Sequence, residues 1–84
     1  MKIFYSPKFF RLYKKLSREI KDKAKEKEAI FRVNPFDNQL KTHKLNGEFK
    51  DFWSFSVDYE IRIIFKFQDA DTVRFHLIGD HDIY

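Results

Sequence analysis

The amino-acid sequence predicts an α+β domain in which a mainly antiparallel sheet packs on an N-terminal helical hairpin. Apolar residues have helical spacing between residues 7 and 33, whereas Phe52–Val57, Ile61–Phe67 and Thr72–Ile78 are rich in β-branched and aromatic residues. The connections between these later segments are short, which favours antiparallel neighbours. With a short apolar segment at the start, the predicted order is β-α-α-β-β-β in one domain, residues 1–84.

The first strand and the hairpin are predicted from their boundaries. Met1–Tyr5 has strand propensity and ends at Ser6-Pro7, where a capping hydroxyl precedes a proline that suits the first turn of a helix. A second helix begins near Ser17 and ends at Asn34-Pro35, because the residue before a proline is disfavoured in helical geometry. The first helix places four apolar residues on one face: Phe9, Leu12, Tyr13 and Leu16.

The sheet is predicted to follow a polar connection, residues 36–51, with one apolar anchor at Leu45. Under strict alternation, one face of the sheet packs on the helices and includes Val73, Phe75 and Leu77. The opposite face, called the open face below, points away from the helices and presents Arg62, Lys66, Arg74 and His76. Such a row of cations either holds RNA phosphates or is an ordinary solvated strand surface.

Composition and charge narrow the class of protein. The chain has 11 Phe, four Tyr, one Trp and no Cys, so we expect an aromatic core without a disulfide framework or thiolate zinc site. No apolar run has the length of a membrane span, and we expect a soluble intracellular protein. Residues 1–50 carry 14 Lys/Arg against 6 Asp/Glu, a net charge of +8, and residues 51–84 carry 3 against 7, a net of −4. The basic half favours a nucleic acid or an acidic protein partner, or serves solubility alone.

The titratable residues do not form a recognised catalytic or metal motif by spacing. His43, His76 and His81 are not spaced as metal ligands, so no metal site is predicted. Neither a glycine-rich phosphate loop nor a Ser/His/Asp order is present. The closing residues GDHDIY place His81 and Tyr84, two groups that can move protons, behind the last strand. By spacing alone, a frayed terminus is the favoured interpretation.

Three segments of the sequence carry a family resemblance. They are HKLNG at 43–47, YEIRIIF at 59–65 and IGDH at 78–81 followed by Tyr84. With the order β-α-α-β-β-β in so short a chain, they resemble the RelE/ParE toxin superfamily along essentially the whole sequence. The most similar group is the RelE/StbE-like mRNA interferases, which include YafQ-like and YoeB-like toxins. The resemblance implies a single RelE-like toxin domain.

The resemblance implies a toxin of a type II toxin–antitoxin pair. Such toxins cleave mRNA in the ribosomal A site, which inhibits translation and growth. The 2′-hydroxyl of the RNA attacks the adjacent phosphate and leaves a cyclic phosphate and a free 5′-hydroxyl, without a metal or a small-molecule cofactor. The implied partner is a cognate antitoxin in the cytoplasm. From the charge distribution we expect an acidic, partly disordered antitoxin segment, on the helical hairpin or in the groove near His81.

Position by position, the resemblance implies five catalytic residues. Arg62 matches the strand arginine that acts on the scissile phosphate, and His81 is assigned general acid or base. Tyr84 matches a C-terminal aromatic that orients the nucleotide or assists proton transfer. Asp58 matches an acidic residue before the middle strand, and His43 matches a histidine that opens an HxLxG-like segment. Candidate contacts to the RNA backbone are Lys41, Lys44, Lys50, Lys66 and Arg74.

The sequence also departs from the family pattern, and two alternatives to the nuclease stay open. A YafQ-like histidine four residues before Asp58 is Ser54 here, and the positions of a RelE-like lysine pair hold Trp53 and Phe55. The general base is therefore unassigned among Asp58, His43, His81 and Tyr84. The alternatives are a ParE-like gyrase inhibitor without nuclease activity and an inactive antitoxin-binding member.

Overall fold

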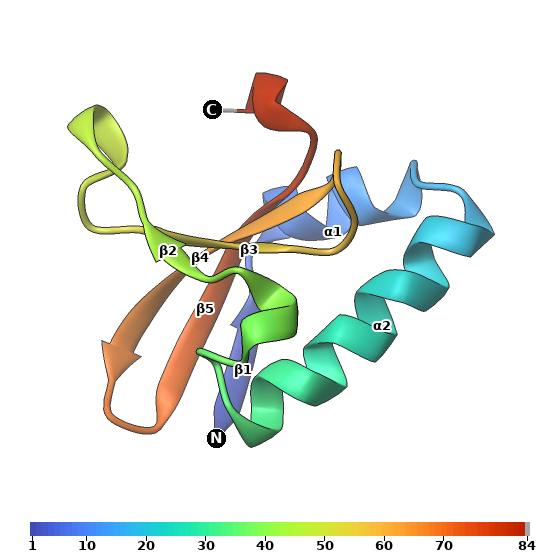
Figure 1. Cartoon of the computed structure of the whole chain (residues 1–84). Coiled ribbons are helices and arrows are strands. Elements are labelled where there is room, and N and C mark those ends of the chain that lie inside the picture. The colour runs from blue at the N-terminus through green and yellow to red at the C-terminus, as the bar shows by residue number, and fades with distance from the viewer. Residues whose placement is uncertain (84) are drawn as a thin grey trace.

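The computed structural model describes residues 1–83 and has two α-helices and a five-stranded sheet (Figure 1). The main elements are β1 (Lys2–Tyr5), α1 (Pro7–Lys14), α2 (Arg18–Val33), β2 (His43–Lys44), β3 (Trp53–Ser56), β4 (Arg62–Asp69) and β5 (Thr72–Gly79). Three short 3₁₀ turns are η1 (Asn38–Leu40), η2 (Gly47–Phe49) and η3 (His81–Ile83). The strand order is β1-β5-β4-β3-β2, with β1 parallel to β5 and the other pairs antiparallel. The predicted α+β class is confirmed.

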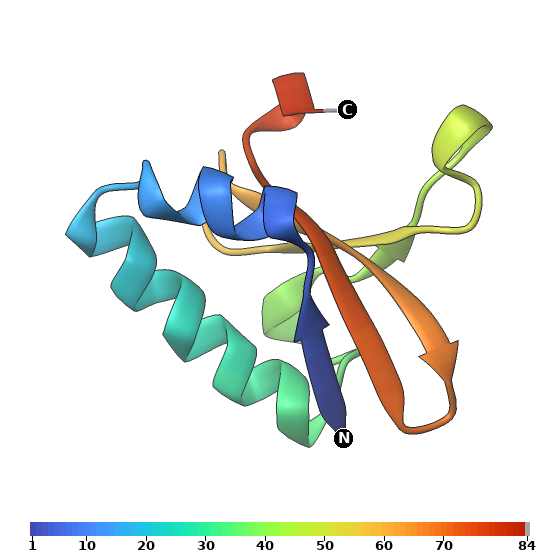
Figure 2. The ribbon, with the colours of Figure 1, turned by 180° about the vertical axis from the view of Figure 1, so that it is seen from behind.

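The first strand pairs with the last one, and a serine joins both to α1. β1 lies alongside β5 with Ile3 opposite Val73 (Figure 2). The Ser6 hydroxyl accepts a hydrogen bond from the Phe9 amide at 2.9 Å, which caps α1 as predicted. The same hydroxyl donates to the carbonyl of His76 at 2.7 Å. Ser6 therefore fixes the start of α1 against β5.

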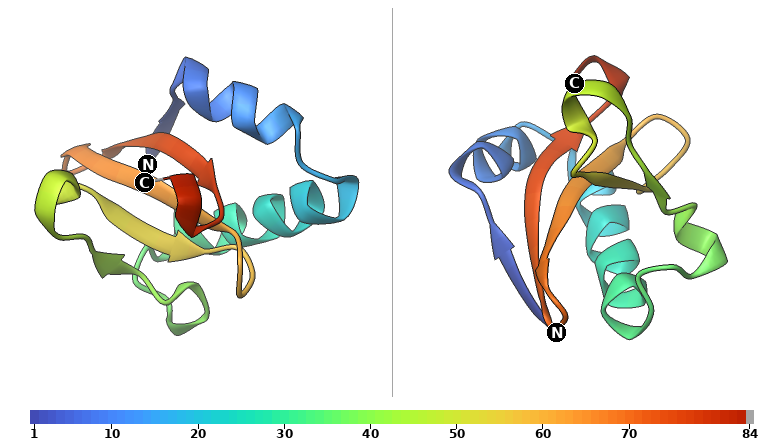
Figure 3. Two further views of the ribbon diagram at one scale, coloured as in Figure 1. Left: turned by 90° about the horizontal axis from the view of Figure 1, so that it is seen from above. Right: turned by 90° about the vertical axis from the view of Figure 1, so that its left-hand side faces the viewer.

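The core is aromatic and lies between the helices and the sheet. Phe31 of α2 has no exposed surface, and its ring centroid is 4.9 Å from those of Phe55 and Phe65 and 5.4 Å from that of Phe75. The helix α2 lies across the sheet, whereas α1 lies beside the β1–β5 edge (Figure 3). Since aromatic rings bury large areas, a few of them suffice for a core in a chain of 84 residues.

The sequence predictions differ from the structure in the connection between α2 and β3. We expected residues 36–51 to lack regular structure, but they contain η1, the two-residue strand β2 and η2. β2 pairs with β3 at the edge of the sheet, His43 opposite Ser54 and Lys44 opposite Trp53. A strand of two residues shows no apolar alternation, so it has no signature in the sequence. Leu45 is buried, as predicted for the anchor.

A β-bulge in β5 overturns the predicted placement of Leu77. Ile64 pairs with Leu77 and the next residue, Phe65, pairs with Phe75, so His76 is an extra residue in β5. The bulge reverses the alternation beyond it, and Leu77 packs with Ile64 and Leu45 in a small second cluster, away from Phe75. The open face is therefore partly covered by apolar side chains, with Phe49 and Phe52 packed against this cluster.

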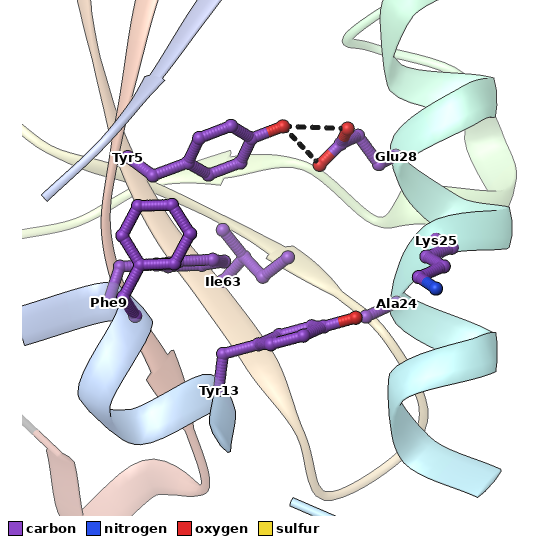
Figure 4. Close-up of a pocket in the computed structure, with 8 residues that line it drawn as sticks. Tyr5, Phe9, Tyr13, Ala24, Lys25, Glu28 and Ile63 are labelled. Carbon is purple, nitrogen blue, oxygen red and sulfur yellow. Dashed lines mark hydrogen bonds between the residues drawn. The ribbon is translucent and has the colours of Figure 1, made fainter. Parts of the chain in front are cut away.

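A small apolar cavity of 190 Å³ lies between α1, α2 and β1 (Figure 4). Tyr5, Phe9 and Tyr13 line it, and the Tyr5 hydroxyl donates to both carboxylate oxygens of Glu28, at 3.0 and 2.9 Å. Burial, and secondly the Glu28 carboxylate, raises the pKa of Tyr5 above its usual value. Neither helix within residues 1–83 is long and apolar enough to cross a membrane.

Candidate functional site

A polar cavity of 310 Å³ lies where α2, η1 and the β3–β4 turn meet. Its lining includes Arg62 at the start of β4, Asp58 in the turn, Lys41 after η1 and Lys27 in the middle of α2. β2 pairs with β3 only at Trp53–Ser54. The far end of β3 is therefore an open edge that side chains from both faces of the sheet can reach. The remaining lining residues are Gln39, Ser56, Val57 and Tyr59.

Arg62 is the residue best placed in this cavity to bind an anion. Its backbone is paired on both sides, with Ser56 of β3 and Gly79 of β5, and its side chain is half-buried. None of the ion pairs within residues 1–83 includes Arg62. A half-buried guanidinium without a carboxylate partner can hold a phosphate through two parallel hydrogen bonds. Ile63 packs in the main core and Ile64 in the second cluster, so alternation places Arg62 on the open face, as predicted, at the edge of a cavity that Lys27 of α2 also lines.

Two lysines bring further positive charge to the cavity. Lys41 adopts the left-handed backbone conformation, with φ 52° and ψ 40°, at the end of η1. This conformation is costly for a residue with a Cβ atom, and its presence at a candidate site is consistent with a functional constraint. Lys27 is half-buried in α2. Together with Arg62, these lysines give the cavity three cations against the single carboxylate of Asp58.

The Asp58 carboxylate organises the turn that forms one wall of the cavity. Its Oδ1 atom accepts hydrogen bonds from the backbone amides of Glu60, at 2.8 Å, and Ile61, at 2.7 Å. This arrangement is an Asx turn, which fixes the backbone just before Arg62. Asp58 therefore has a structural role here whether or not it also takes part in proton transfer.

The two predicted histidines lie apart from the lining of the cavity. His43 is exposed on β2, where its Nδ1 atom is 3.1 Å from the Lys41 carbonyl. His81 lies in η3, just beyond Gly79, the residue paired with Arg62. Its side chain is 82% exposed, and its Nε2 atom is 3.6 Å from Asp82. Tyr84, the remaining predicted catalytic residue, lies outside the residues that the structure describes.

The other predicted RNA contacts are spread over both faces of the sheet. Lys44 lies over the Trp53 ring, 6.0 Å from its centroid, on the opposite face from His43. Lys50 is exposed at the end of η2. Lys66 and Arg74 pair across β4 and β5 on the open face. Of the five predicted lysine and arginine contacts, only Lys41 reaches the Arg62 cavity.

Several lining residues, among them Lys27 and Gln39, are not among the site residues that the sequence predicted. Lys27 belongs to a helix whose charges alternate in sign, and this pattern is typical of an ordinary solvated surface. What distinguishes it is its half-buried side chain at the cavity, and that is a tertiary property. Within residues 1–83 no group of three or more His, Asp or Glu side chains gathers as a metal site would require.

Comparison with known proteins places this fold among bacterial toxins. No protein-family model and no curated protein sequence matches the chain. YafQ from E. coli strain BL21(DE3) matches with a TM-score of 0.81 at 23% identity, over 98% of this chain and 94% of YafQ. The YoeB/ParE toxin from Agrobacterium tumefaciens matches with a TM-score of 0.81 at 16% identity, over 96% of this chain and 99% of that toxin. A chain of the YoeB–YefM complex from Staphylococcus aureus has a TM-score of 0.78 at 20% identity, over 96% and 97%.

At these identities the similarity establishes the fold. The chain has the RelE-like toxin fold, and the fold that the sequence resemblance implied is confirmed. The match extends over nearly all of this chain and nearly all of each toxin, so the two-helix hairpin and the sheet belong to the shared architecture.

Proposed function

We propose that this protein is the toxin of a type II toxin–antitoxin pair and acts as a ribosome-dependent endoribonuclease on mRNA. The fold it shares with YafQ and YoeB supports the toxin assignment. The observation that supports RNA cleavage is the half-buried, unpaired Arg62 guanidinium in a cavity that also holds Lys27 and Lys41. Cleavage would inhibit translation and growth in the cytoplasm.

In this proposal Arg62 binds the scissile phosphate. The 2′-hydroxyl oxygen attacks phosphorus and loses its proton to a base, and the bond from phosphorus to the 5′-oxygen then breaks. The leaving oxygen takes a proton from an acid, which yields a cyclic phosphate and a 5′-hydroxyl without a metal or cofactor. Negative charge develops on the phosphate oxygens in the transition state, where a fixed guanidinium stabilises it most. Lys27 and Lys41 add to that positive field.

The proton transfers are proposed for the side chains at the same end of the sheet. His81 follows Gly79, the cross-strand partner of Arg62, and is exposed enough to approach a bound nucleotide. A histidine exchanges protons near neutral pH, which suits a general acid or base. His43, Asp58 and Tyr84 are the candidates for the second proton transfer. Lys44, Lys50, Lys66 and Arg74 remain proposed contacts to mRNA or ribosomal RNA.

An antitoxin is proposed as the protein partner. Among the similar structures are the DinJ–YafQ complex from E. coli and the YoeB–YefM complex from Staphylococcus aureus, both toxin–antitoxin complexes. The net charge of +8 over residues 1–50 favours an acidic antitoxin segment.

The test is to induce the protein in bacteria without an antitoxin and to map the 5′ ends of cellular mRNA. We expect codon-phased cuts that Arg62→Ala reduces by about 100-fold or more and that His81→Ala also reduces. Arg18→Ala, which removes an exposed arginine at the start of α2, is the matched control and should leave the cuts unchanged. Uncut mRNA on induction of the wild-type protein would refute the nuclease proposal.

One observation favours a second candidate function, that of a catalytically inactive antitoxin-binding member. Ser54, at the position of the YafQ-like histidine, has no exposed surface, and neither has Phe55, at one position of the RelE-like lysine pair. These positions therefore supply no titratable group to a substrate. DNA-damage signalling with intact mRNA in the induction experiment would support gyrase inhibition, and no growth effect would indicate an inactive antitoxin-binding member.

A further inference from the structure

A second group of cations lies on the open face, apart from the Arg62 cavity. Lys66 of β4 is directly opposite Arg74 of β5, and cross-strand partners project on the same face. Like charges in this arrangement repel and destabilise a sheet. None of the ion pairs within residues 1–83 includes either side chain. The pair is therefore electrostatically unfavourable in the free protein and would be relieved by an anion.

Next to this pair, the bulge residue His76 lies close to a third cation, Lys8. The His76 carbonyl accepts the hydrogen bond from Ser6, the cap of α1, so Lys8 in the first turn of α1 lies close by. Burial, and then the charges of Lys8 and Arg74, lowers the pKa of His76 below its usual value. The first turn of α1 has no acidic residue to offset these charges.

Phe52 holds the group in place from the side of β3. Its ring is stacked on the His76 ring, with centroids 4.9 Å apart and an interplanar angle of 30°. The Lys66 ammonium nitrogen is 5.8 Å from the centroid of the same Phe52 ring. Lys66 and His76 are thereby positioned by one aromatic side chain, which limits the freedom that an anion would have to restrict on binding.

We propose that Lys8, Lys66, Arg74 and His76 form a phosphate-binding site for the backbone of the same RNA strand whose scissile phosphate lies at Arg62. An arginine that holds two phosphate oxygens beside lysine point charges is a common arrangement for a phosphodiester. Lys66 is four residues from Arg62 along β4, about 13 Å at the rise of a strand. This separation corresponds to about four stacked nucleotides at 3.4 Å each. That the bound phosphates belong to the RNA strand held at Arg62 rests on the proposed function.

The test is the affinity for RNA that cannot be cleaved, measured by fluorescence anisotropy with 2′-O-methyl oligonucleotides of eight and of two nucleotides. For the octamer, we expect Lys66→Gln and Arg74→Gln each to weaken binding by about tenfold. Their double variant should lower the slope of log affinity against log salt by about 0.7, the value for one phosphate on a single strand. The dinucleotide is too short to reach both sites, so its binding in the Arg62 cavity should not depend on Lys66 or Arg74.

Lys15→Gln is the matched control, because it removes an exposed lysine at the end of α1 outside the group. It should leave both affinities within about twofold of wild type, and thermal unfolding should confirm that all variants are folded. Equal octamer affinity in wild type, Lys66→Gln and Arg74→Gln would overturn the proposal. So would binding of an acidic peptide such as polyglutamate, but not RNA, with loss in the same variants.

A second readout follows the His76 ring by NMR as the pH is changed. The charged groups that face it are Lys8 from α1, Arg74 from β5 and Lys66 beyond Phe52 from β4. A bound phosphate offsets these charges, so the octamer should raise the pKa of His76 and the dinucleotide should not. An unchanged His76 titration with bound octamer would overturn the proposal. Because binding is measured without cleavage, an inactive protein with these effects would refute the nuclease and leave the site standing.

Discussion

Replacing Ser54 with alanine is expected to stabilise the protein. Within residues 1–83 the Ser54 hydroxyl has no hydrogen-bond partner, and the residue has no exposed surface between His43 and Ile64 of the neighbouring strands. A buried hydroxyl without a partner costs about 1–3 kcal/mol. The small void left by the oxygen reduces this benefit, and we expect a net gain of about 1 kcal/mol. For a domain of this size that gain raises the melting temperature by about 4–8 °C.

The assay is thermal unfolding by circular dichroism, together with urea unfolding, of the wild type and Ser54→Ala. Ser56→Ala is the matched control, because Ser56 is two residues along the same strand, half-buried at the polar cavity. Its free energy of unfolding should change by less than about 0.5 kcal/mol. A lower melting temperature for Ser54→Ala would show that the hydroxyl has a favourable partner and would refute the reasoning. Unchanged mRNA cleavage in this variant would show that Ser54 has no catalytic part.

Three further predictions concern the cap, the cavity and the pH dependence. Ser6→Ala should lower the free energy of unfolding, measured in urea, by about 1–2 kcal/mol. The loss should exceed that of Ser17→Ala, which removes an exposed cap, because Ser6 is buried and also donates a hydrogen bond to β5. Equal losses in the two variants would contradict this prediction. Lys41→Gly should raise the free energy of unfolding by about 0.5–1 kcal/mol, because glycine adopts the left-handed conformation freely. The same variant should bind RNA more weakly. A lower free energy of unfolding would count against backbone strain at this position. Burial and two nearby cations lower the pKa of His76 from 6.5, so below pH 6.5 the unfolded chain takes up this proton more readily than the folded protein. The free energy of unfolding should therefore rise with pH up to about 6.5 and level off above it. The rise should be smaller in His76→Gln, and an identical pH profile in that variant would contradict the assignment of this effect to His76.

Local chemistry made the helices and the long strands predictable. A serine followed by a proline starts α1, Ser17 caps α2, and Asn34 before Pro35 ends it, as the sequence predicted. Each of these signals acts within a few residues of the boundary that it sets. The β4–β5 hairpin follows in the same way from two apolar runs with a short polar connection.

The features that the sequence could not predict depend on residues far apart in the chain. The bulge at His76 reverses the face of Leu77, and it is stabilised by Ser6, 70 residues earlier. Arg62 and Asp58 could be proposed from a resemblance, but their neighbour Lys27 belongs to a helix whose charge pattern is unremarkable. Tertiary packing decides which cations meet at a cavity, and this packing cannot be inferred from a single sequence.

The parallel pairing of β1 with β5 has a consequence for the order of folding during synthesis. The first strand cannot pair until residues 72–75 have been made, and the hydrogen bond from Ser6 to β5 also requires His76. Phe31 likewise lacks the Phe75 ring until then. Contacts this distant in sequence delay folding, because the chain must close a long loop before the contacts stabilise it. A nascent chain therefore cannot complete its aromatic core until β5 has been made.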